Sequence, residues 1–64
     1  MQRQPPPMTE HELLIEARNE VWEVINQLKA EGDYGNADSL ILEAARCGGH
    51  MDWLMLREDA LTFV

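Results

Sequence analysis

Apolar residues recur at every seventh position between residues 10 and 31. Leu14, Val21 and Leu28 follow this spacing, and smaller apolar residues lie between them. Seven residues make almost two turns of an α-helix, so residues at this spacing share one side of it. The pattern predicts one long amphipathic helix over residues 10–31, whose apolar side has to pack against other elements.

Both ends of this predicted helix carry sequence signals. Thr9 followed by Glu12 fits the capping box, in which the Thr side chain accepts a hydrogen bond from the backbone three residues later. Glu10 and Glu12 suit the positive end of the helix dipole. Gly32 can take the left-handed conformation that ends many helices. The boundaries are therefore expected close to residues 10 and 31.

The segment "GDYGNAD" that follows is predicted to be a tight turn. Asn36 or Asp38 is expected to cap a second helix over residues 37–47, which Gly48 and Gly49 end. The remaining segment has a helical pattern over residues 50–61. On this third helix, one apolar face is predicted to consist of Trp53, Leu56, Ala60 and Phe63.

These elements predict an all-α fold, with an antiparallel helical hairpin and a short third helix. Residues 9–64 are expected to form a single helical domain, and residues 1–8, with three consecutive prolines, an extended tail. A chain of 64 residues has little material for a core, and its single cysteine cannot form an internal disulfide. We therefore expect a second chain to add stability, most simply as a symmetric homodimer.

Charge restricts the partners that this chain can bind. Twelve acidic residues against five basic ones give a formal net charge of −7. Nucleic acid binding depends on Lys and Arg that contact phosphates, so a nucleic acid is not the expected partner. An acidic surface is suited instead to a protein with a basic surface, although acidity also serves solubility alone. No apolar run suits a membrane span or a signal peptide, which predicts a cytoplasmic protein.

The stretch "LKAEGDYGNADSLILEAA" resembles the middle of a tetratricopeptide repeat. The turn of that family is matched by Gly32, Asp33 and Tyr34, and its packing positions on the second helix by Ala37, Ile41 and Ala44. The chain departs from the family at Ile25, where the repeat usually has a small residue, and at Gly49, where it has a proline. Trp22 lies one place later than the pattern requires. The resemblance covers a single repeat and implies protein binding.

Residues with possible chemistry are few. Cys47 and His50 have a spacing found in zinc sites, but a structural zinc site needs four ligands, and only His11 and carboxylates could complete the set. The same two residues could form a nucleophile and base, yet no oxyanion hole is recognisable. We therefore predict no enzymatic activity, no metal and no cofactor.

Apolar residues in excess of the predicted core form the candidate binding surface. Ile15 and Trp22 lie beyond the main stripe of the first helix, and Met51 and Met55 lie nearly opposite Trp53 on the third. Aromatic residues are frequent interface hot spots, and Met surfaces adapt to varied partners. The predicted partner-binding residues are Ile15, Trp22, Met51, Leu54 and Met55, with Glu16, Glu20 and Glu23 on an acidic side.

The function predicted from these features is that of a small acidic protein-binding module. It would act as an inhibitor, an anti-activator or an adaptor by covering a partner's surface. Its size, its acidity and its lack of catalytic motifs look like the small inhibitory proteins of bacteriophages. The alternative is a small transcription regulator, in which the second and third helices form a helix-turn-helix. The third helix would then face phosphates with Asp52, Glu58 and Asp59 against Arg57 alone.

Overall fold

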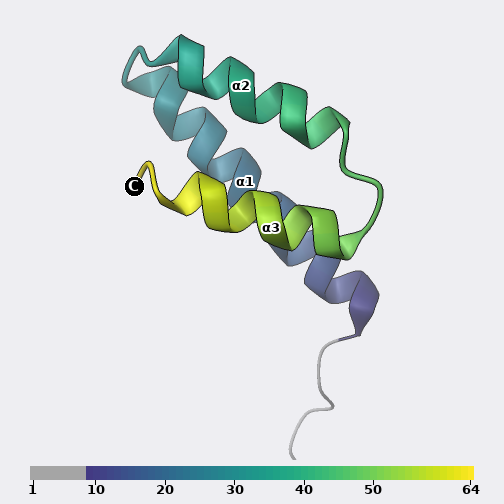
Figure 1. Cartoon of the computed structure of the whole chain (residues 1–64). Helices are drawn as coiled ribbons and strands as arrows, with labels where there is room; N and C mark the ends of the chain where they lie inside the picture. The colour runs from purple at the N-terminus through teal and green to yellow at the C-terminus, as the bar shows by residue number, and fades with distance from the viewer. Residues whose placement is uncertain (1–8) are drawn as a thin grey trace, which may run out of the picture.

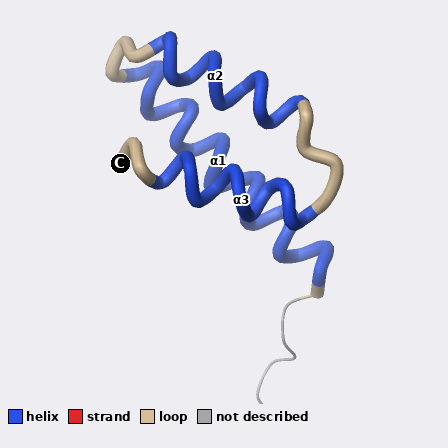
Figure 2. The backbone as a smooth tube through the Cα atoms, viewed as in Figure 1, coloured by secondary structure: helices blue, strands red, loops and turns tan. Residues whose placement is uncertain are grey.

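The computed structural model describes residues 9–64, and this part of the chain consists of three helices with no strand. They are α1 (Glu10–Ala30), α2 (Tyr34–Ala45) and α3 (His50–Leu61) (Figure 1). The all-α prediction is confirmed, and two short loops join the helices (Figure 2). The tail predicted over residues 1–8 lies outside the described residues. Within residues 9–64, no helix combines the length and the apolar character that crossing a membrane requires.

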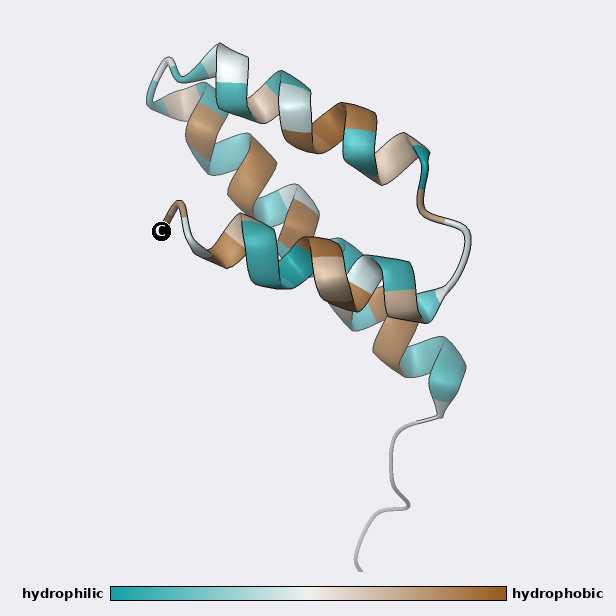
Figure 3. Ribbon diagram, viewed as in Figure 1, coloured by the Kyte–Doolittle hydropathy of each residue, from teal (hydrophilic) through white to brown (hydrophobic). Residues whose placement is uncertain are grey.

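Helix α1 begins at the predicted capping residue. The backbone N–H of Glu12 donates to Thr9 Oγ1 at 3.2 Å, which satisfies one of the unpaired donors of the first turn. Glu10 and Glu12 lie in that turn, where their charge favours the helix dipole. Alternating apolar and polar bands along α1 in Figure 3 mark it as amphipathic.

A turn of three residues, 31–33, joins α1 to α2. Gly32 has a φ of +82°, the left-handed conformation that glycine adopts at low cost. The N–H of Gly32 donates to the carbonyl of Lys29 at 3.0 Å, and the N–H of Asp33 to that of Leu28 at 2.8 Å. These two bonds form a Schellman motif, which satisfies the last carbonyl groups of α1.

Helix α2 begins three residues earlier than its predicted start at residue 37. Its N-cap is Asp33, so the prediction of Asn36 or Asp38 as the cap is wrong. The Asp33 carboxylate accepts from the Asn36 backbone N–H at 3.5 Å and from Asn36 Nδ2 at 2.7 Å. Asp33 thus closes α1 through its backbone and opens α2 through its side chain, which leaves Tyr34 and Gly35 inside the helix.

Helix α3 has its predicted bounds, and its inner face is nearly as expected. Trp53, Leu56 and Ala60 are buried, whereas Phe63 is exposed, so its assignment to this face is wrong. The reason is that α3 ends at Leu61 and Phe63 follows the C-cap residue Thr62.

Helix α1 packs against both other helices, while α2 and α3 contact each other only slightly. Figure 1 shows α2 lying alongside α1 after the turn and α3 crossing in front of α1. Two side-chain contacts link α1 to α3: His50 Nδ1 lies 3.1 Å from Glu10 Oε1, and Arg57 pairs with Glu20 at 3.5 Å. Because both sets of residue numbers rise together, α1 and α3 run in the same direction. The buried core consists of Ala17, Val21, Val24, Ile25, Leu28, Ala37, Leu40, Ala44, Trp53, Leu56 and Ala60.

We expect Gly32→Ala to lower the free energy of unfolding by about 1–2 kcal/mol, because a Cβ disfavours the left-handed conformation. Space is not the obstacle, since a Cβ at Gly32 would meet no atom within 4 Å. Gly35→Ala is the matched control, because a Cβ there also meets nothing and Gly35 lies inside α2 with an ordinary φ. Urea denaturation should show Gly35→Ala unchanged or more stable. Equal effects of the two substitutions would contradict this account of the turn.

Candidate functional site

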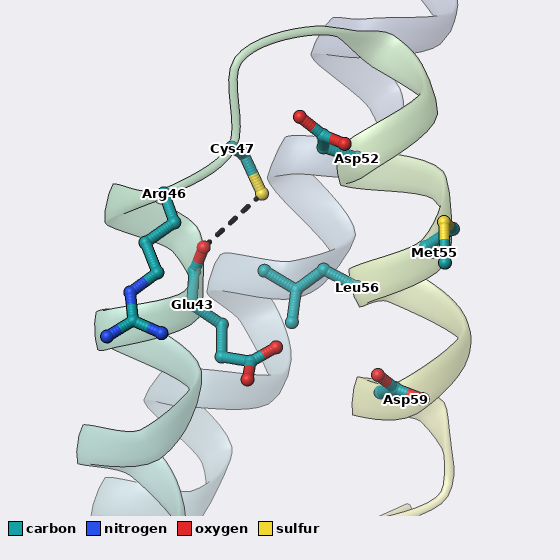
Figure 4. A pocket seen from close by; sticks show the side chains of 7 residues that line it. All are labelled: Glu43, Arg46, Cys47, Asp52, Met55, Leu56 and Asp59. Atoms are coloured by element: carbon teal, nitrogen blue, oxygen red, sulfur yellow. Dashed lines mark hydrogen bonds between the residues drawn. The ribbon is translucent and has the colours of Figure 1, made fainter.

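An open groove of about 250 Å³ lies between the end of α2 and the length of α3. The α2 side and the adjoining loop contribute Glu43, Arg46 and Cys47. The α3 side contributes Asp52, Met55, Leu56 and Asp59. In Figure 4, Leu56 points into the space between the two helices, with Glu43 across from it on α2 and Arg46 just past the end of that helix. We refer to these seven residues as the groove.

The groove has an apolar floor and a charged rim. Leu56 is almost fully buried, and Met55 beside it is 64% exposed. The rim has three carboxylates, those of Glu43, Asp52 and Asp59, and one guanidinium, that of Arg46. This arrangement holds a surplus of negative charge around an apolar strip.

The loop at the end of the groove is held by two hydrogen bonds. The backbone N–H of Gly48 donates to Asp52 Oδ2 at 2.9 Å. The thiol of Cys47 donates to the carbonyl oxygen of Glu43 at 3.4 Å, the bond drawn in Figure 4. Both contacts fix the loop against its neighbouring helices, so the end of the groove has a defined shape.

The chemistry of Cys47 does not suit a nucleophile. Burial raises the pKa of the Cys47 thiol, and the nearby carboxylates of Asp52 and Glu43 raise it further. The thiol therefore stays protonated at neutral pH, whereas nucleophilic attack and zinc binding both need the thiolate. His50 Nδ1 contacts Glu10, so this nitrogen is engaged away from Cys47. Across residues 9–64, no three His, Cys, Asp or Glu side chains are placed to hold a metal ion together.

A second hollow, of about 430 Å³, lies where the first turns of α1 and α3 meet. Its lining residues are Glu10, His11, Leu14, Gly49 and His50. The Glu10–His50 pair crosses it, and Leu14 packs on the core. This hollow belongs to the contact that holds the start of α3 on α1.

The candidate residues Ile15 and Trp22 lie on α1, on the side away from α3. Glu20 faces α3 because it pairs with Arg57. Trp22 follows two residues later, about 200° further around the helix, and Ile15 lies seven residues before Trp22 on the same side. Trp22 is 38% exposed and Ile15 half-buried. We call this pair the α1 surface.

Met51 and Met55 lie on the side of α3 that points away from α1. Met55 precedes Arg57 by two residues, and Arg57 faces Glu20, so the same geometry turns Met55 outward. Met51 lies one turn earlier on this side and is 60% exposed. Leu54, in contrast, is half-buried and packs against the core. The two methionines form what we call the α3 surface, which is separate from the α1 surface.

The three candidate glutamates differ in their surroundings. Glu16 and Glu23 are exposed, as expected for a solvated side of α1. Glu20 is half-buried and pairs with Arg57, although Arg57 Nε makes no hydrogen bond of good geometry there. Glu20 therefore contributes to the contact between α1 and α3, and only the other two glutamates face solvent freely.

Sequence reasoning did not find the groove as a unit. It singled out Met55, and it considered Cys47 only for metal binding or catalysis. The groove brings Glu43 of α2 close to Asp52 and Asp59 of α3. The sequence carries no periodic signal for the way α2 and α3 are placed on α1.

Comparison with known proteins gave no relative for this chain. No protein-family model, no curated protein and no solved structure matched it. The functional argument therefore starts from the surfaces described above.

We expect alkylation of Cys47 to reach half of its maximal rate at a higher pH in the folded chain than in the same chain in urea. The folded state holds the thiol proton more tightly, so its stability should also fall as pH rises through the unfolded thiol's pKa. Glu43→Gln should lower the pH of half-maximal alkylation only part of the way toward that of the unfolded chain, because burial, the larger cause of the raised pKa, remains. Glu16→Gln, remote from the groove, serves as the control and should leave it unchanged. Identical midpoints in the folded and unfolded chains would contradict the assignment.

Proposed function

We propose that this chain acts by binding another protein and covering part of that protein's surface, as an inhibitor, an anti-activator or an adaptor. The observation that carries the proposal is the α3 surface, where Met51 and Met55 are both more than half exposed beside the groove. Exposed apolar surface rimmed by polar residues is typical of protein interaction sites. Methionine side chains suit such sites because they are flexible and polarizable.

The charges of the groove and of α3 support a protein partner over a nucleic acid. A helix-turn-helix regulator would present α3 to phosphates, yet Arg57 is turned toward Glu20 on α1. Asp52, Glu58 and Asp59 remain exposed on α3 and would repel phosphates. The resemblance to a tetratricopeptide hairpin, with α1 and α2 as its antiparallel helices, agrees with protein binding. A cytoplasmic setting would suit the one free thiol.

We further propose that the α1 surface forms a symmetric homodimer. The exposed neighbours of Trp22 one turn away on α1 are Arg18, Asn19 and Asn26, none of which is acidic. Two copies of a chain with a net charge of −7 can therefore meet here with little repulsion. A twofold axis near Trp22 would bury both indoles in a self-complementary contact.

Trp22→Ala is expected to raise the dimer dissociation constant by about 30-fold, the effect of losing an interface hot spot of about 2 kcal/mol. Sedimentation equilibrium measures this constant, and circular dichroism checks that the helices remain. Tyr34→Ala removes an aromatic side chain that is exposed on α2, so it should leave the dimer unchanged. A wild-type chain that stays monomeric at every concentration would refute the dimer.

Met55→Asp is expected to abolish co-purification of the partner from the cells that naturally make this protein. The reason is that a charge replaces an apolar contact at the centre of the proposed surface. Leu42→Asp is the matched control, because Leu42 is 62% exposed on α2 and does not line the groove. It should leave co-purification intact. Equal loss with both variants, or no loss with either, would count against the α3 surface.

A further inference from the structure

The groove has the polarity of a site for one more helix. It follows α3 from Asp52 to Asp59 and meets α2 only at its C-terminal end, near Glu43. A helix is the element that fits between two helices, because its side chains can pack between theirs.

We propose that the groove binds a basic amphipathic helix of a partner protein. This inference rests on the proposed protein-binding function and specifies the chemistry of the partner. The apolar side of the incoming helix would rest chiefly on Met55, which lines the groove and is 64% exposed, because Leu56 beneath it is only 3% exposed. Lys or Arg residues flanking that side would face the rim carboxylates, chiefly those of Glu43 and Asp59.

Charge complementarity selects this occupant. The rim holds three carboxylates and one guanidinium, so a basic helix is attracted and an acidic helix is repelled. A second copy of this chain is a poor occupant for the same reason. Its own α3 would bring Asp52, Glu58 and Asp59 toward Glu43 and Asp59 of the groove. Self-association and partner binding therefore use different surfaces.

The direct test uses two synthetic peptides about four helical turns long. One has leucine on one side and lysine on the other, and its counterpart carries glutamate in place of lysine. Titration calorimetry with the full chain should show binding of the Leu/Lys peptide and none of the Leu/Glu peptide. Affinity should fall as salt is raised, because exposed charges are screened. Equal binding of both peptides, or of neither, would overturn the proposal.

A pair of charge variants locates the binding site. Glu43→Gln with Asp59→Asn removes two rim charges and should weaken the Leu/Lys peptide by up to about fivefold per carboxylate. Neither side chain makes a hydrogen bond that holds the fold, whereas Asp52 accepts one from Gly48 and is left intact. Glu31→Gln with Asp38→Asn removes the same charge from two exposed positions outside the groove and should have little effect. Equal losses would mean that the peptide responds only to net charge.

A pair of apolar variants tests the lip of the groove. Met55→Ala should weaken peptide binding by about tenfold, while Leu42→Ala, equally exposed but outside the groove, should not. Circular dichroism shows whether each variant keeps its helices. A peptide bound as tightly by Met55→Ala as by wild type would place the site elsewhere.

Failure of this inference and failure of the proposed function give different results. If the Leu/Lys peptide does not bind but Met55→Asp abolishes capture of the natural partner, the function stands and the basic helix is wrong. If capture depends on Trp22 and not on Met55, the groove itself is wrong. Loss of neither capture nor peptide binding in any groove variant would reject the groove and the α3 surface as binding sites, whereas failure of the wild-type chain to capture any partner would reject the proposed function.

Discussion

Helix α1 supports the whole fold, because α2 and α3 each pack on it and contact one another only slightly. Small residues at the contacts, Ala17 on α1, Ala37 on α2 and Ala60 on α3, are all fully buried and allow close approach. The groove is thus a consequence of how the core is built: α2 and α3 each pack toward α1 and have few contacts with each other.

The helices could be predicted from the sequence because their signals are local. Thr9 marks the start of α1 because its side chain accepts a hydrogen bond from the first turn. Gly32 marks the end because it adopts a positive φ. The start of α2 was missed because Asp33 serves two helices at once, whereas sequence reasoning assigned the cap to a later polar residue. Phe63 was wrongly assigned to the inner face of α3 because the apolar periodicity of the sequence continues past Leu61, where the helix ends.

The candidate surfaces were only partly predictable. Exposure of Trp22, Met51 and Met55 follows from counting apolar residues against the helix faces available to cover them. That count cannot show on which side of the molecule each face lies. The burial of Val21 on α1 and of Leu56 and Ala60 on α3 decides it, and the pairing of Glu20 with Arg57 marks the sides of α1 and α3 that meet. An ion pair between residues so far apart in sequence leaves no pattern in either segment.

The separation of the α1 and α3 surfaces has a consequence for how such a module would work. Trp22 points away from α3, and Met55 points away from α1, so occupying one surface leaves the other open. A dimer formed through Trp22 would carry two grooves, one on each copy. Two linked sites bind a partner that carries two basic helices far more tightly than one site does, provided that the spacing allows both to engage. On this view dimerisation would tune the affinity of the groove without adding any contact to it.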